Sequence, residues 1–251
     1  MKCSYKKFKL SLVPFIIYFL IIKICMVSIP HAATNDGNEN DFELPKYLKN
    51  DDIEIYKDES RKEVCSVLYT LRQQMSKGSG KANLALSDFI GPKDKKIQDY
   101  IGAFAVTAGI DMEKKSNEFK KNNDDYGSIM LSAICDRFAE AFAERLHERV
   151  RKEFWGYAED EKLDSQDLIS EQYQGIRPAP GYPACPDHSE KSSLFQLLDV
   201  EKNTGIKLTE NFAMWPAASI CGYYFSHPKS SYFGVGKLNK DQVSDYATRK
   251  E

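Results

Sequence analysis

The residue types that could do covalent or metal chemistry are few and poorly grouped in this sequence. Cys185 and His188 are three residues apart and could share one side of a helix, but a zinc site would need distant recruits such as His147 or His227. The sequence has no Gly-x-Ser-x-Gly nucleophile motif, and Cys185 has no obvious local base. The Gly-Val-Gly run at 234–236 lacks the third glycine and the following helix of a dinucleotide site. We therefore expect no catalytic residue and no metal in this chain.

A proline-rich segment that opens with Arg177 offers binding chemistry instead. Its prolines, at positions 178, 180, 183 and 186, bar a regular helix and favour extended backbone. The Arg177 guanidinium could grip a carboxylate at a fixed place, beside free backbone carbonyls and the ring of Tyr182. Such a segment suits a zwitterionic small ligand. The alternative is that Arg177 pairs with a neighbouring acid such as Glu171 and the prolines only connect two helices.

A long helix over 125–153 is the clearest element that could position such a site. Large apolar residues recur near every fourth position along it: Met130, Ile134, Phe138, Phe142, Leu146 and Val150. Acidic residues follow a neighbouring face at the same spacing: Asp136, Glu140, Glu144 and Glu148. For most of these acids we expect a solvated face with basic partners such as Arg145 and Arg149.

Shorter elements complete an α+β pattern. Further helices are predicted in the second half of 53–74 and over 165–175, 187–205 and 240–250. The run 100–106 fits a strand or the start of a buried helix equally well. The β-prone runs 218–225 and 232–238 predict a hairpin, in which Tyr232 and Phe233 would more often be sheet core than ligand platform. We expect one antiparallel sheet, with strands from both halves of the chain.

The composition is that of an ordinary globular protein with one anomalous end. The 251 residues are 42% hydrophobic and 29% charged with a net charge of −2, which gives no reason to expect nucleic acid as a partner. Near the N-terminus four lysines precede an uncharged run at 10–22. Segment 1–33 therefore suits a signal peptide, an anchor extending to residue 29, or an artefact of gene fusion or start-site choice. Segment 34–50 is expected to be a polar linker.

The Arg177 segment also carries a family resemblance. The resemblance is to the activation domain of cobalamin-dependent methionine synthase, and it rests on the run RPAPGYPACPDHSEK at 177–191. Upstream lies GYAEDE, and downstream lies KLTENFAMWPAASICGYYFSHPKSSYFGVGKLNKDQVSDYATRK. DDIEIYKDESR and NLALSDFIGPKD extend the match, which covers about 51–251. Relative to that family, the chain is expected to be truncated at its C-terminus.

The resemblance implies a fold and a function. The fold would be a single C-shaped α+β domain, whose central antiparallel sheet is flanked by helices. The domain would bind S-adenosylmethionine and support reductive methylation of cob(II)alamin. Its partners would be a cobalamin-binding domain of methionine synthase in trans and flavodoxin or a related reductase. The implied location is the cytoplasm, whereas a signal or anchor within 10–29 would imply an exported or membrane-anchored protein.

The resemblance also assigns roles in S-adenosylmethionine binding. Arg177 would grip the methionine carboxylate, while the backbone around Ala179, together with Tyr182, would hold the rest of the ligand. Further contacts would come from Asp88, in the Leu-Ser-Asp-Phe stretch, and from the aromatic pair Tyr232 and Phe233. Weaker candidates for the ammonium or sulfonium side are Glu140 and Glu171. A buried carboxylate there would be electrostatically sensible.

Departures from the whole enzyme limit this interpretation. The sequence has no Asp-x-His-x-x-Gly motif for ligating cobalt and no cysteine cluster for zinc and homocysteine, and the folate-binding portion is absent. The chain alone is therefore not expected to synthesise methionine. The alternative to a reactivation module is a non-catalytic gene fragment, or a membrane-tethered or exported relic that keeps only the fold.

Overall fold

The computed structural model describes residues 6–10, 20–28, 51–78, 81–93, 95 and 97–251, and gives only the backbone of the first two ranges. Most of segment 1–33 and all of 34–50 lie outside the described residues, so the predicted signal or anchor and the polar linker stay predictions. The backbone of Leu20–Ser28 forms a strand, β2. Within the described part of the chain, no helix is both long and apolar enough to cross a bilayer.

The centre of the fold is an antiparallel sheet. Its strands lie in the order β4 (Val64–Leu68), β3 (Ile53–Tyr56), β2, β5 (Asp99–Thr107) and β8 (Ser219–Tyr224), and β1 (Lys6–Leu10) also pairs with β2. A separate two-stranded sheet joins β6 (Lys207–Leu208) to β7 (Met214–Trp215). With helices packed on this framework, the structure confirms the expected α+β class and central antiparallel sheet.

Strand β5 shows how the sheet supports two cores. Successive side chains of a strand point to opposite faces. Ile101, Ala103 and Ala105 therefore face a core built with α4 (Glu190–Leu198) and α5 (Val200–Thr204). Phe104 and Val106 face the other side, where α2 (Asp125–Arg149) packs. Both faces of β5 pack against apolar residues. The run 100–106 therefore lacks the alternation of polar and apolar residues that marks a strand with one exposed face.

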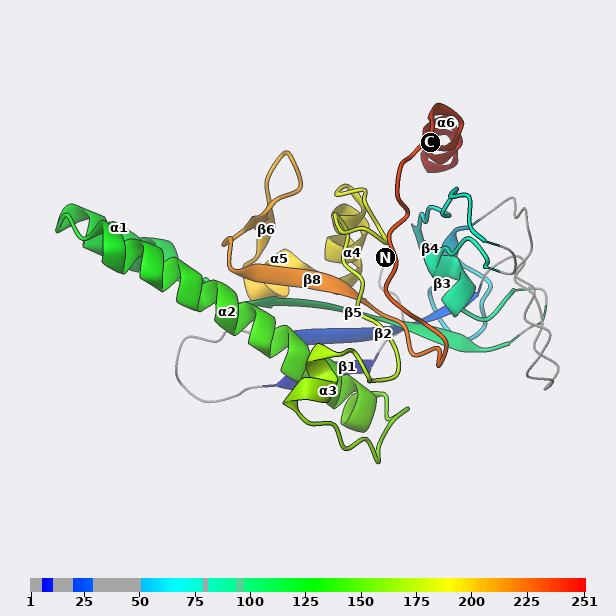
Figure 1. Ribbon diagram of the computed structural model, residues 1–251, viewed down its shortest axis with the longest axis horizontal. Helices are drawn as coiled ribbons and strands as arrows, with labels where there is room; N and C mark the ends of the chain where they lie inside the picture. The colour runs from blue at the N-terminus through cyan, green and yellow to red at the C-terminus, as the bar shows by residue number, and fades with distance from the viewer. Residues whose placement is uncertain (1–5, 11–19, 29–50, 79–80, 94, 96) are drawn as a thin grey trace.

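Helix α2 projects past the sheet, and α1 (Met112–Lys121) lies beside that projecting half (Figure 1). The Asp124 side chain caps the start of α2 by accepting a hydrogen bond from the backbone of Gly127. The end of α2 continues into a π-helical turn, Val150–Phe154.

The apolar line predicted along this helix is not a single buried stripe. Ile134 and Phe138 are exposed, whereas Leu146 and Val150 are buried. Each four-residue step turns about 40° further than one helical turn, so a strict four-residue line winds around the helix.

Two predicted elements are wrong, and each misses a long-range pairing. The helix expected within 53–74 is instead β3 and β4, because Val64–Leu68 pairs antiparallel with Ile53–Tyr56. The hairpin over 218–238 does not form, since β8 pairs with β5 and 232–236 runs as irregular chain. The β-propensity of 232–236 is overridden by its packing against other loops.

The remaining helices differ from expectation mainly in length. Helix α3 (Ser165–Ile169) ends earlier than predicted. The helix expected over 187–205 is broken into α4 and α5 at Asp199, which adopts a left-handed conformation with φ 49°. Helix α6 (Lys240–Lys250) forms as predicted, and a 3₁₀ turn (Leu86–Phe89) lies before β5.

Gly222 in β8 lies where the proline-rich segment packs closely against the sheet. A Cβ at this position would lie 2.8 Å from the carbonyl oxygen of Pro178 and 2.9 Å from Cε1 of Phe104. Gly222→Ala is therefore expected to lower the free energy of unfolding by about 1–3 kcal/mol through overpacking, as measured by urea denaturation. The same substitution at Gly78, where nothing lies within 4 Å, is the matched control. Equal stability of the two variants would contradict the close approach of Pro178 to β8.

Candidate functional site

A cavity of about 890 Å³ lies between α2, the proline-rich segment, β8 and residues 232–234. Of the residues predicted to bind ligand, all but Asp88 line this cavity: Arg177, Ala179, Tyr182, Tyr232, Phe233, Glu140 and Glu171. The volume is within the usual range for small-molecule pockets. The structure thus brings together residues that lie up to 93 positions apart, from Glu140 to Phe233.

Arg177 is placed by backbone pairing with strand β8. Ile176 and Phe225 exchange backbone hydrogen bonds of 3.0 Å, and the carbonyl of Pro178 accepts a 2.9 Å hydrogen bond from the Tyr223 amide. The Arg177 amide donates to the Tyr232 hydroxyl at 3.0 Å. Because the backbone is held on both sides of Arg177, its side chain leaves the sheet edge in a defined direction.

The Arg177 guanidinium has three side-chain partners. Nη2 lies 2.5 Å from Oε2 of Glu144, while Nη1 lies 3.2 Å from the Tyr173 hydroxyl and 3.1 Å from Nδ1 of His147. The predicted alternative partner, Glu171, lines the cavity but does not form this ion pair. Burial alone would lower the pKa of Arg177, but the oxygens of Tyr232, Tyr173 and Glu144 raise it overall. Arg177 is thus a partly buried cation that faces a cavity.

The rest of the proline-rich segment forms a tight turn rather than an extended chain. The Tyr182 amide donates a hydrogen bond to the carbonyl of Ala179, and the Gly181 amide donates a hydrogen bond of 2.7 Å to the carbonyl of Cys185. Gly181 has φ +92°, and a Cβ there would clash with the ring of His188. Only a glycine combines this backbone conformation with that close packing. The turn leaves Tyr182 66% exposed, at the cavity rim.

Carboxylates line the cavity together with Arg177. Glu140 and Glu144 line it from α2, and Glu171 adds a third carboxylate. Glu140 also pairs with Arg137 at 2.9 Å, which places it near solvent. Oε1 of Glu144 is buried and has no hydrogen-bond partner among the described residues. A cavity that holds both carboxylates and the Arg177 guanidinium suits a ligand that carries both a carboxylate and a cationic centre.

Lys191 lines the cavity from the side of α4. Its Nζ lies 2.7 Å from Nδ1 of His188, and burial lowers its pKa. Cys185 and Cys221 are buried free thiols nearby, and burial raises the pKa of the Cys221 thiol to about 12. A thiol of that pKa stays protonated at neutral pH and is a poor nucleophile. Within the described residues, no group of three or more His, Cys, Asp and Glu side chains could hold a metal ion.

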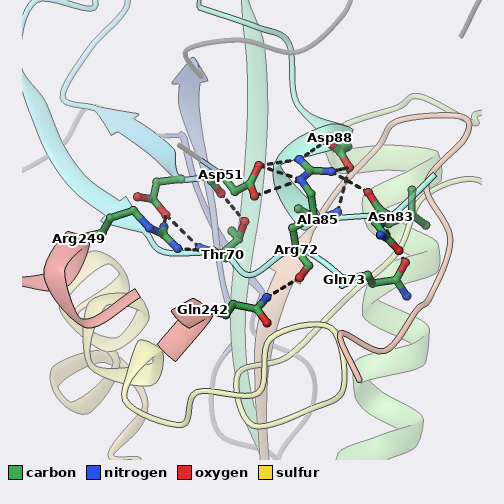
Figure 2. Close-up of polar contacts among 11 residues, drawn as sticks. Asp51, Thr70, Arg72, Gln73, Asn83, Ala85, Asp88, Gln242 and Arg249 are labelled. Carbon is green, nitrogen blue, oxygen red and sulfur yellow. Dashed lines mark hydrogen bonds and ion pairs between the residues drawn. The ribbon is translucent and has the colours of Figure 1, made fainter. Parts of the chain in front are cut away.

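Asp88 does not line the cavity but belongs to a separate ionic cluster with Arg72 and Asp51 (Figure 2). Both of its carboxylate oxygens accept hydrogen bonds of 2.7 Å from Arg72, and Oδ2 also accepts one from the Ala85 amide at 2.9 Å. Arg72 is shared with Asp51, at 2.6 Å. Next to Arg72 in the chain, the Gln73 side chain donates a hydrogen bond to the carbonyl of Gly234, and Gly234 lines the cavity. The cluster is therefore linked to the cavity wall through Gln73.

The cavity also has polar residues that the sequence did not single out as ligand contacts, among them Glu144, Tyr173, His188 and Lys191. Glu144 did belong to the acidic line of the long helix, where a solvated face was expected. Its position four residues after Glu140 was the available signal. Tyr173 and Lys191 had no such signal, since their contacts depend on how the loops return to α2 and β8.

The chain is similar to known proteins in both sequence and structure. The family model described as "Vitamin B12 dependent methionine synthase, activation domain" matches residues 43–251. A crystal structure of the MetH reactivation domain bound to AdoHcy superposes with a TM-score of 0.81 at 51% sequence identity. The match covers 92% of this chain and 65% of that chain, so the sequence spans less than two thirds of its structural relative.

Proposed function

Because the chain belongs to the family of vitamin B12-dependent methionine synthase activation domains, we propose that it binds S-adenosylmethionine and supports the reactivation of cobalamin. The resemblance found in the sequence is confirmed by that membership. The observation that carries the proposal is the Arg177 cavity, which is lined by nearly all the residues expected to contact the ligand. The matching reactivation domain binds AdoHcy, which is the demethylated form of the proposed ligand.

The charges of the cavity fit the two ends of this ligand. The methionine carboxylate would bind Arg177, beside the backbone of Ala179. The sulfonium and ammonium groups would be stabilised by the carboxylates of Glu144, Glu140 and Glu171. A buried, unpartnered oxygen on Glu144 supports this orientation, because an unpaired carboxylate oxygen is costly unless a donor or cation approaches it.

The chain needs no acid, base or nucleophile for this role. S-adenosylmethionine supplies an activated methyl group at its sulfonium centre, and cobalamin on another domain would supply the acceptor. The residues of the cavity bind and orient the ligand and exclude water from it. The inert, protonated thiol of Cys221 is consistent with that role.

Isothermal titration of the full chain with S-adenosylmethionine tests the proposal. Saturable binding with a stoichiometry of one is expected, together with competition by AdoHcy. Absence of saturable heat at ligand concentrations up to about 1 mM would overturn the proposed function, since specific cofactor sites bind more tightly than that.

The proposed partner is a cobalamin-binding domain of methionine synthase supplied in trans, with flavodoxin or a related reductase as electron donor. An exposed apolar surface on α2 supports the first of these partners: Tyr126, Ile129, Met130, Ile134 and Phe138. Exposed apolar patches of this kind mark interaction sites. Ile134 and Ala141 are seven residues apart on one side of α2, and Ala141 lines the cavity. A domain that covers this surface would therefore reach the cavity mouth.

Phe138→Glu on the α2 surface is expected to weaken binding of the separately prepared cobalamin-binding domain at least about tenfold, because a charge would be desolvated in the interface. Analytical ultracentrifugation measures that affinity, and the Kd for S-adenosylmethionine should stay unchanged. Val243→Glu on α6, where the side chain is 51% exposed, is the matched control. Equal loss in both variants, or no loss at Phe138, would contradict the proposed interface.

A cytoplasmic location is proposed from the family alone. Fractionation of cells that express the tagged full chain tests it. Recovery in the soluble cytosolic fraction, without cleavage, is expected, whereas a membrane-bound or processed product would favour an anchor or signal within 10–29.

A further inference from the structure

His147 is fully buried on α2 and contacts the ligand-facing Arg177. Its ring stacks on Tyr224, with centroids 5.1 Å apart and planes 21° apart. It also meets the ring of Tyr173 edge-on at 5.1 Å. The ring is therefore fixed in position and orientation by aromatic packing, and it stands behind the cavity rather than among the residues that line it.

The contact with Arg177 fixes the protonation state of His147. A guanidinium only donates hydrogen bonds, so Nδ1 of His147 must be the acceptor and the proton must lie on Nε2. Burial lowers the pKa of His147 well below its usual value, and the cations Arg151 and Arg177 lower it further. Nε2 is buried without a partner among the described residues. The ring is thus a neutral acceptor whose single polar contact within that part of the structure is Arg177.

This contact occupies one edge of the Arg177 guanidinium. Nη1 is held by His147 and Tyr173, and Nη2 donates to Glu144. A guanidinium has five N–H groups, so Nε and one hydrogen of Nη2 remain without a partner among the described residues. The Nε–Nη2 edge can bind a carboxylate through two parallel hydrogen bonds.

We propose that His147 is a positioning residue that holds the Nη1 edge of Arg177, so that its Nε–Nη2 edge is available to the ligand carboxylate. This inference rests on the proposed function for the identity of the ligand. Without the acceptor at Nδ1, the guanidinium would be held by Tyr173 and Glu144 alone and could rotate toward Glu144. Affinity would then fall only for ligands that carry the carboxylate.

The test compares two ligands in two variants. His147→Phe keeps an aromatic ring but removes the acceptor, while His147→Asn keeps an acceptor near the position of Nδ1. We expect His147→Phe to raise the Kd for S-adenosylmethionine about tenfold. The Kd for 5′-methylthioadenosine, which has no carboxylate, should change less than about twofold, and His147→Asn should recover most of the lost affinity. Val150→Ala, a buried substitution one turn further along, controls for a loss of stability alone.

The outcomes separate a positioning role for His147 from a purely structural one. Equal losses for both ligands, or no loss for either, would overturn the positioning role. A nitrogen NMR spectrum of the wild-type protein adds a readout that needs no ligand: His147 should be in the Nε2–H tautomer, and Arg177→Lys should shift its Nδ1 resonance. If the wild-type protein does not bind S-adenosylmethionine, the proposed function fails, while the spectrum still decides whether His147 holds Arg177.

Discussion

Arg177→Ala is expected to weaken the binding of S-adenosylmethionine about 10- to 150-fold. The proposed contact is a charge-assisted, bidentate hydrogen bond to the ligand carboxylate in a partly buried site, and such contacts contribute about 1.5–3 kcal/mol. The guanidinium is already anchored by His147, Tyr173 and Glu144, so little ordering entropy opposes the contact. Isothermal titration of the variant against the wild-type chain measures the effect.

Two further variants separate the geometry of Arg177 from its charge. Arg177→Lys keeps the charge but offers a point donor instead of a planar fork, so most of the affinity should still be lost. Glu144→Gln removes the neighbouring carboxylate and leaves Arg177 free to bind the ligand. If Glu144 stabilises the sulfonium centre of the ligand, Glu144→Gln should weaken the binding of S-adenosylmethionine more than that of AdoHcy, whose sulfur is an uncharged thioether. A wild-type Kd for folded Arg177→Ala would contradict the assignment of the carboxylate site.

The sequence predicted Arg177 but could not predict what surrounds it. Local chemistry left two interpretations open, a binding loop or a connection in which Arg177 pairs with a nearby acid, and only the family resemblance assigned Arg177 to a ligand. Glu144 and His147 lie 33 and 30 residues before Arg177, and nothing local reveals that α2 passes beside the loop. The error in 53–74 has the same origin, since the helical spacing of Val64, Leu68 and Leu71 does not reveal that Val64–Leu68 pairs with β3.

Asp88 shows the same limit in a residue whose role was carried over from a family. The resemblance assigns it to the ligand, whereas the structure places it in the 3₁₀ turn Leu86–Phe89. Its partner Arg72 is 16 residues away, and the ion pair between them depends on how β4 and the 3₁₀ turn pack. In this structure both carboxylate oxygens are occupied by Arg72, so the ligand contact stays a prediction that must be tested against a structural role.

Asp88→Ala is expected to lower the free energy of unfolding by about 3 kcal/mol. The Asp88 side chain is only 2% exposed, and removing one member of a buried ion pair leaves an uncompensated charge, which costs about 3–5 kcal/mol. Asp51 still contacts Arg72 at 2.6 Å, so the lower end of that range applies. The Ala85 amide also loses the carboxylate that accepts its hydrogen bond. Urea denaturation followed by circular dichroism measures the change in midpoint.

The two roles of Asp88 make opposite predictions when stability and binding are measured on the same variants. Asp88→Asn keeps the shape and an acceptor for Ala85 while removing the charge, so it should lose less stability than Asp88→Ala. Glu59→Ala, at an exposed position, is the control and should stay within about 0.5 kcal/mol of wild type. If Asp88 only holds Arg72, titration of the folded variants below their unfolding temperature will give the wild-type Kd for S-adenosylmethionine. Wild-type stability with a Kd raised tenfold would instead make Asp88 a ligand contact, and Arg72 would then have to release its carboxylate when the ligand binds.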